Sequence, residues 1–68
     1  MSDRVFKKIR ITGCSEESVE KAVQLAISKA GESVRGMAWF EVVELRGAIH
    51  DERAVEWQVT VDVNFRVD

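Results

Sequence analysis

"AVEWQVTVDVNFRV", Ala54 to Val67, is the stretch that decides the fold. Apolar and polar side chains alternate over its whole length. The apolar set is Val55, Trp57, Val59, Val61, Val63, Phe65 and Val67, and the polar set is Glu56, Gln58, Thr60, Asp62, Asn64 and Arg66. Successive side chains of a strand point to opposite faces of its sheet, so this alternation predicts a long strand with one apolar face.

The segment upstream predicts the partner of this strand in an antiparallel hairpin. Trp39–Arg46 is rich in strand formers, and the polar stretch Gly47–Arg53 is expected to connect the two strands. This second strand carries apolar residues at both parities: Trp39, Val43 and Leu45 at one, Phe40 and Val42 at the other. One helix cannot cover both faces, so another subunit or a ligand is expected to cover the second.

The first half of the chain predicts a strand and a helix. Val5–Thr12 is expected to form a strand with one mostly apolar and one mostly basic face. After it, apolar residues recur at spacings of three and four, as on one face of a helix: Val19, Ala22, Val23, Ala26, Ile27, Ala30 and Val34. Ser15 is the predicted N-cap and Gly36 the predicted stop. The order strand, helix, strand, strand predicts an α+β protein with the helix on one face of a three-stranded antiparallel sheet.

Length and residue counts limit how this fold is stabilised. The 68 residues are expected to form a single domain, 1–68, whose isolated core would be marginal. Cys14 is the only cysteine and His50 the only histidine, which excludes an intrachain disulfide and argues against a transition-metal site. Association of subunits is the stabiliser that remains.

The charge pattern argues against several classes of partner. Hydrophobic residues make up 46%, charged residues 32%, and the net charge is −2 with both signs interspersed. There is no basic run, so nucleic-acid binding has no support. The first ten residues lack the apolar core of a signal peptide and no apolar run is long enough for a membrane, so a cytoplasmic protein is expected. One unpaired cysteine fits that reducing compartment.

Three segments carry a resemblance to a known family. "VFKKI…TGCSEESVEKAV", "WFEVVELRGAI" and "VEWQVTVDVNFRV" follow one another at the separations found in the dodecins, which this sequence resembles from about Val5 to Val67. Dodecins are small flavin-binding proteins that assemble as hollow homododecamers. The resemblance implies a sheet partly wrapped around the helix and flavins bound in pairs between subunits.

The resemblance also implies which residues hold the ligand. Trp39 would stack on the isoalloxazine, with two symmetry-related tryptophans enclosing the flavin pair, and Gln58 would hydrogen-bond the polar edge of the ring. Arg46 would suit a flavin phosphate or ribityl chain, and Glu44 matches an acidic residue that helps to hold a cation in some members. Arg46 favours FMN and leaves FAD and riboflavin open. Some members also bind coenzyme A, for which no residue is assigned. Trp57 stands where the family often has tyrosine.

These residue types suit a flavin chemically. An electron-rich indole stacks favourably on the flat, electron-poor ring, and base–aromatic stacking, a fair analogue, is worth about 1–3 kcal/mol. A glutamine amide offers both a donor and an acceptor to the pyrimidine edge. Without the resemblance, Trp39 is more typical of a core or interface residue than of a ligand contact, and Gln58, Arg46 and Glu44 are more typical of a solvated strand face.

The implied function is storage of oxidised flavin, with quenching of its photochemistry by tryptophan and no catalysis. A flavin-dependent redox enzyme and a purely structural oligomer are the alternatives. Trp57 shares its parity with the valines and is expected to be a packed core residue. Cys14 has no base nearby in sequence and is expected to be structural, and His50 and Asp51 are expected to be solvated.

Overall fold

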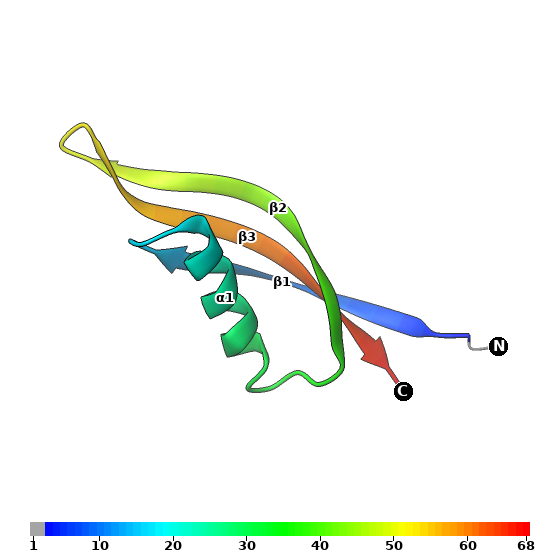
Figure 1. Ribbon diagram of the computed structural model, residues 1–68. Coiled ribbons are helices and arrows are strands. Elements are labelled where there is room, and N and C mark those ends of the chain that lie inside the picture. Colours follow the sequence, from blue (N-terminus) through cyan, green and yellow to red (C-terminus); the bar gives the residue numbers. More distant parts are fainter. Residues whose placement is uncertain (1–2) are drawn as a thin grey trace.

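The computed structural model describes residues 3–68 and contains four elements in the predicted order (Figure 1). They are strand β1 (Val5–Ser15), helix α1 (Val19–Ala30), strand β2 (Met37–His50) and strand β3 (Arg53–Val67). The strands form one antiparallel sheet in the order β1-β3-β2, so the last strand along the chain lies in the middle. The predicted α+β class and strand–helix–strand–strand order are confirmed.

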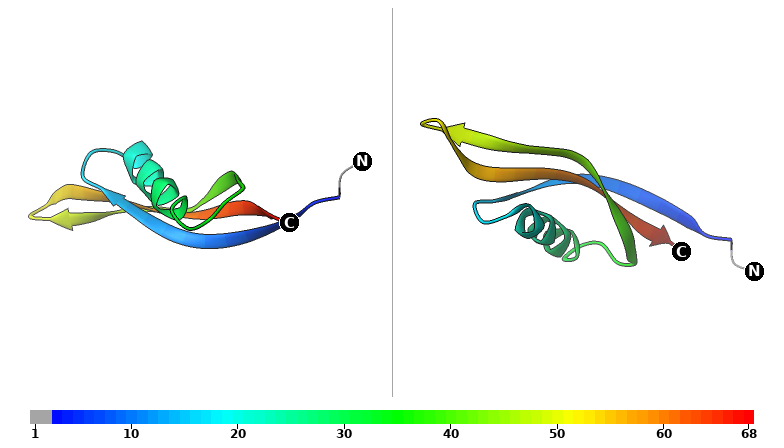
Figure 2. Two further views of the ribbon diagram at one scale, coloured as in Figure 1. Left: turned by 90° about the horizontal axis from the view of Figure 1, so that it is seen from below. Right: turned by 45° about the horizontal axis from the view of Figure 1, so that its top comes forward.

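The helix covers only part of one face of this sheet. It packs against β1 and β3 and does not reach β2. Figure 2 shows the sheet curving past α1 on one side, while the β2–β3 hairpin extends well beyond the helix. The molecule is accordingly elongated, with extents of 55 × 20 × 14 Å. We call the side that carries α1 the helix face and the opposite side the polar face.

A small core lies between α1 and β3. Val59, Val61 and Val63 of β3 are almost fully buried against Ala22 and Ala26 of the helix. Burying a valine contributes about 1.5–3 kcal/mol, so these three residues are the main apolar anchor of the sheet. The alanines let the helix lie close to the strands.

Gly13 in β1 allows this close approach. A Cβ at Gly13 would overlap the backbone carbonyl of Ala22 and press on the Ala26 side chain. β1 runs through Gly13 to Ser15 because these residues pair with Val59, Gln58 and Trp57. The strand is therefore three residues longer than predicted, since the apparent Gly–Cys connection is part of the sheet.

The helix begins at a different serine from the one predicted. Ser18 is the N-cap: its backbone is extended, and its Oγ accepts a hydrogen bond of 3.0 Å from the Lys21 amide. Ser15 is still part of β1, and its hydroxyl accepts from the amide of Glu17 at 3.0 Å in the connecting bend. The Ser15 prediction is wrong because pairing with β3 keeps that residue extended.

The helix also ends earlier than predicted. Gly31 is the C-cap, and its N–H donates to the Ile27 carbonyl at 2.9 Å. Arg35 Nη1 donates to the Gly31 carbonyl at 2.6 Å and satisfies one acceptor of the last turn. Gly36, the predicted stop, has φ +76° and reverses the chain into β2. The prediction that Gly36 ends the helix is wrong, since it lies directly before β2.

The hairpin is tighter than the sequence indicated. Most of the predicted connection Gly47–Arg53 belongs to the two strands, and His50 pairs directly with Arg53. Only Asp51 and Glu52 form the turn, with φ values of 51° and 62°. Two positive φ values match a two-residue type I′ turn, which follows the natural twist of the strands. The polar composition of the segment concealed this, because no Asn-Gly or Asp-Gly pair marks the turn.

Two irregularities in β2 change which face its residues occupy. The pairing with β3 slips between Met37 and Trp39 and again between Val42 and Glu44, as in β-bulges. Leu45 is therefore opposite Val59 on the helix face, together with Phe40 and Val42. The prediction that Leu45 shares a face with Trp39 is wrong, since strict alternation fails at a bulge.

Candidate functional site

Trp39 lies at the polar face, near the start of β2. It pairs in register with Asn64, and its ring lies 4.8 Å from that of Phe6, centroid to centroid, at an interplanar angle of 59°. Phe6 comes from β1 on the other side of β3. The indole remains 47% exposed although it has an aromatic neighbour. Phe6 thus supports the Trp39 ring, and about half of the Trp39 side chain remains open for stacking.

The other three predicted residues meet at the far end of the same face. Arg46 and Gln58 are register partners, and Arg46 Nε donates to Gln58 Oε1 at 2.7 Å. Arg46 Nη1 donates to Glu44 Oε1 at 3.2 Å. Gln58 Nε2 in turn donates to Glu56 Oε1 at 2.8 Å. We call this chain of four side chains, Glu44, Arg46, Gln58 and Glu56, the glutamine row.

Trp39 and the glutamine row are too far apart to meet one ligand ring in a single chain. Trp39 is opposite residue 64 of β3, whereas Gln58 lies six residues earlier on that strand. At a rise of about 3.3 Å per residue, this separation is about 20 Å along the strand. The structure therefore groups Gln58, Arg46 and Glu44, and places Trp39 apart from them.

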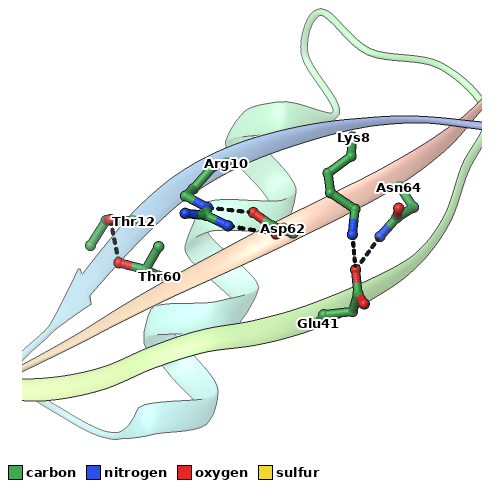
Figure 3. Close-up of polar contacts among 7 residues, drawn as sticks. All are labelled: Lys8, Arg10, Thr12, Glu41, Thr60, Asp62 and Asn64. Atoms are coloured by element: carbon green, nitrogen blue, oxygen red, sulfur yellow. Dashed lines mark hydrogen bonds and ion pairs between the residues drawn. The ribbon is translucent and has the colours of Figure 1, made fainter.

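A ladder of polar contacts fills the space between them (Figure 3). Lys8 Nζ and Asn64 Nδ2 both donate to Glu41 Oε1, at 2.7 and 3.0 Å. Arg10 donates two hydrogen bonds to the carboxylate of Asp62, at 2.8 and 3.0 Å. These contacts cross-link all three strands on the polar face.

The ladder fixes the charge of its members. The hydrogen bond to Glu41 raises the pKa of Lys8, and the hydrogen bonds from Lys8 and Asn64 lower the pKa of Glu41. The guanidinium of Arg10 lowers the pKa of Asp62 through the hydrogen bonds, and that contact raises the pKa of Arg10. All four groups are ionised at neutral pH, so this part of the face is an array of satisfied ion pairs.

The helix face of β2 is largely uncovered. Phe40, Val42 and Leu45 are each about half exposed. A groove of about 330 Å³ runs between this strand and the apolar side of α1. A second cleft of about 270 Å³ lies beside Trp39 and Met37. Sites for drug-sized ligands usually have about 300–1,000 Å³, so the groove is at the lower end of that range and the cleft falls below it.

Trp57 is not the packed core residue that its parity predicted. It lies on the helix face, as expected, but it is 39% exposed. Its partner on β1 is Ser15, the last residue of that strand, so Trp57 lies beyond the helix. Its partner on β2 is Gly47, where a Cβ would come within 2.8 Å of the Glu56 carbonyl and 3.9 Å of the Trp57 ring. The glycine therefore permits the close approach of the Glu56 carbonyl, and Trp57 is a surface residue of the single chain.

Sequence reasoning missed two residues of these clusters. Phe6 has the same parity as Lys8 and Arg10 on the mostly basic face of the first strand, and only the order β1-β3-β2 brings it to Trp39. Glu56 is two residues before Gln58, so it occupies the same face of β3, and this spacing could have indicated it. Cys14 is exposed and pairs in register with Gln58. His50 and Asp51 lie at the exposed hairpin tip, their side chains 3.4 Å apart.

Comparison with known proteins places these features in a family. The model of the Dodecin family matches residues 5–68. A curated dodecin of Thermus thermophilus is 42% identical over 65 residues, which is 96% of this chain and 94% of that protein. The dodecin from Streptomyces davaonensis superposes with a TM-score of 0.91 at 39% identity, covering 98% of both chains. That from Streptomyces coelicolor gives 0.93 at 34% identity, covering 100% of this chain and 97% of its own.

The fold and the exposed tryptophan of the polar face define a small strand–helix–strand–strand protein whose sheet carries an open aromatic surface. The chain belongs to the dodecin family. Within residues 3–68, no helix has the length and apolar character needed to cross a bilayer. The same residues contain no group of three His, Cys, Asp or Glu side chains placed to share a metal ion.

Proposed function

We propose that this dodecin binds oxidised flavin between copies of itself and stores it without turnover. Membership of the family supports a small flavin-binding protein in general. The observation that carries the finer proposal is the separation of Trp39 from Gln58 by about 20 Å along β3. A ring that stacks on Trp39 and is hydrogen-bonded by Gln58 needs these residues from two chains.

The residues present fit a flavin when two chains combine. One side of the Trp39 indole is supported by Phe6, and about half of the side chain is open for stacking. Gln58 brings an amide with donor and acceptor to the ring edge. When bound, the flavin supplies an electron-poor ring that, once excited by light, accepts an electron from indole. Trp39 at van der Waals contact would therefore quench flavin fluorescence and photochemistry.

The uncovered surfaces support assembly into the hollow homododecamer of the family. β2 is an edge strand of 14 residues with an exposed apolar row on its helix face. Exposed apolar surfaces and unpaired edges of this kind are usually covered by another chain. In such an assembly, symmetry would bring two Trp39 side chains together around a pair of flavins. The core of one chain is small, so association also supplies stability.

The flavin proposed is FMN, with FAD and riboflavin as alternatives. Arg46 is the residue suited to a phosphate, because its guanidinium forms a planar fork of donors. In the free chain it already donates to Gln58 and Glu44, so a phosphate would replace the Glu44 contact. Glu44 would then be free to help hold a cation. Coenzyme A remains a possible second ligand, for which no residue is proposed.

Storage is favoured over catalysis by the stacking itself. Each flavin of an enclosed pair would have one face on an indole and the other on the second flavin, which leaves no face for a substrate. A redox enzyme would consume NAD(P)H steadily with an electron acceptor, and we expect no such turnover. A purely structural oligomer would be colourless and would not bind flavin. We also propose the cytoplasm as its location, in keeping with one unpaired thiol.

The test is a titration of the purified protein with FMN, with its mass determined by light scattering after size exclusion. We expect a mass near twelve chains, saturation at one flavin per chain, and strong loss of flavin fluorescence. A monodisperse monomer that binds flavin would refute the two-chain site. A dodecamer that binds no flavin would favour the structural oligomer.

A further inference from the structure

We propose that Glu56 is a positioning residue that fixes the orientation of the Gln58 amide, so that the glutamine row selects rings with an N–H beside a carbonyl. This inference rests on the proposed function, because it concerns how the same site reads its ligand. Glu56 itself touches Gln58 and need not touch the ligand. Its effect would appear as ligand selectivity.

The orientation of the amide follows from the two charged groups beside it. Gln58 Oε1 accepts from Arg46 Nε at 2.7 Å, and Gln58 Nε2 donates to Glu56 Oε1 at 2.8 Å. A guanidinium can only donate hydrogen bonds, and a carboxylate can only accept them. If the amide were flipped, its NH₂ would face the guanidinium and its oxygen would face the carboxylate. Both contacts would then be repulsive, so one orientation is strongly preferred.

The fold holds both neighbours in place. Arg46 is directly opposite Gln58 on β2, and Glu56 is two residues earlier on β3, on the same face. Glu56 and Gln58 are both partly buried, which strengthens their hydrogen bond relative to one in water. Without Glu56, only Arg46 would oppose the flipped orientation, because the planar amide turns as one unit and its NH₂ group would have lost its acceptor.

The oriented amide keeps one acceptor and one donor free. Each amide oxygen has two lone pairs and each NH₂ has two hydrogens, and the row uses one of each. The free pair matches a ligand edge in which a ring N–H lies beside a carbonyl, such as the pyrimidine edge of oxidised flavin. A methyl group on that ring nitrogen removes the donor and blocks the contact. Selectivity against the methylated ring is the property that the orientation of Gln58 should control.

The experiment compares riboflavin with N3-methylriboflavin as ligands of the assembled protein. The variants are wild type, Glu56→Ala, the isosteric Glu56→Gln, and Glu32→Gln as a matched loss of an exposed carboxylate distant from the row. Dissociation constants come from fluorescence titrations, and the mass and melting temperature of each free variant are measured. We expect wild type and Glu32→Gln to prefer riboflavin by about tenfold or more, as a site built for an N–H does.

In both Glu56 variants this preference should fall by about threefold or more, because only Arg46 then opposes the flipped amide. If Glu56→Ala fails to assemble, Glu56→Gln still measures the effect on ligand preference, since it preserves the shape of the side chain and removes only its charge. Equal discrimination by wild type and a folded Glu56 variant overturns the inference, and so does a wild type that binds both ligands equally. Failure of wild type to bind riboflavin at all refutes the proposed function, and the inference with it.

Discussion

Trp39 and Trp57 offer the sharpest test of the flavin site, because the two indoles are similarly exposed and lie on opposite faces of the sheet. Replacing Trp39 by alanine should remove the stacking platform. Stacking on an aromatic side chain is worth about 1–3 kcal/mol, and about 1.4 kcal/mol corresponds to tenfold in affinity. The dissociation constant for FMN should therefore rise by about 5- to 150-fold.

Phenylalanine at the same position separates stacking from quenching. Trp39→Phe keeps an aromatic ring against Phe6 and should retain part of the binding. Phenylalanine is a poor electron donor, so the bound flavin should recover much of its fluorescence. Trp57→Phe is the matched control: because Trp57 is a surface residue of the single chain, its replacement should change stability by no more than about 0.5 kcal/mol. Its binding and quenching should match wild type.

The assay is a flavin fluorescence titration of the three variants and wild type, with the mass of each assembly checked by light scattering. Trp39→Ala should assemble as wild type does, because the half-exposed indole lies outside the core of Ala22 and the β3 valines. If Trp57→Phe restores fluorescence while Trp39→Phe does not, the wrong indole has been assigned and the site lies on the helix face.

Fully reduced FMN should be released on anaerobic reduction and ultrafiltration, because its electron-rich, bent ring stacks less well on indole; equal retention would revive the redox enzyme. Gly13→Ala should prevent α1 from docking, since the new methyl group meets the Ala22 carbonyl, and loss of the near-ultraviolet circular dichroism would reveal this. Glu52→Gly should raise the stability to denaturant by up to about 1 kcal/mol, because Glu52 has φ 62°, a conformation that costs most residues about 1–2 kcal/mol and glycine little; no gain would mean that the turn is unstrained. Acid should destabilise the wild type, because folding lowers the pKa values of Asp62 and Glu41. The contribution of the two ionised carboxylates to stability is fully present above their usual pKa values of 3.8 and 4.5. It is lost as the pH falls through their lower pKa values in the folded chain. A pH titration of the melting temperature in which Asp62→Asn keeps the full acid-induced loss would contradict this.

Hydrophobic periodicity predicted the helix and the strands in their order, but not the residues at which each of them begins and ends. Strict alternation predicted strand β3, though not its central position, and the three-to-four spacing of the alanines predicted the helix. The boundaries failed where tertiary pairing overrides local preference. Ser15 has the chemistry of an N-cap, but pairing with Trp57 keeps it in β1. Polar composition near His50 suggested a loop, whereas a two-residue turn lets the strands continue to the tip.

The sequence indicated four residues of the candidate site, but not how they are arranged. Gln58, Arg46 and Glu44 lie together, as their common parity around the hairpin allows. The distance of Trp39 from them depends on the bulges of β2 and on its register with β3, which no local pattern specifies. Phe6 reaches Trp39 only because β3 lies between β1 and β2. Contacts across a central strand require the topology, and the topology was left open by the sequence.

The position of β3 in the middle of the sheet also has a consequence for biosynthesis. Chains leave the ribosome from the N-terminus, so β1, α1 and β2 emerge before β3. Neither earlier strand pairs with the other, because each forms its ladder only with β3. The nascent chain therefore carries two unpaired strands until β3 emerges, and the sheet can close only then. Folding is expected to be completed after translation of β3, and a message truncated before it should yield a chain that chaperones and proteases recognise as unfolded.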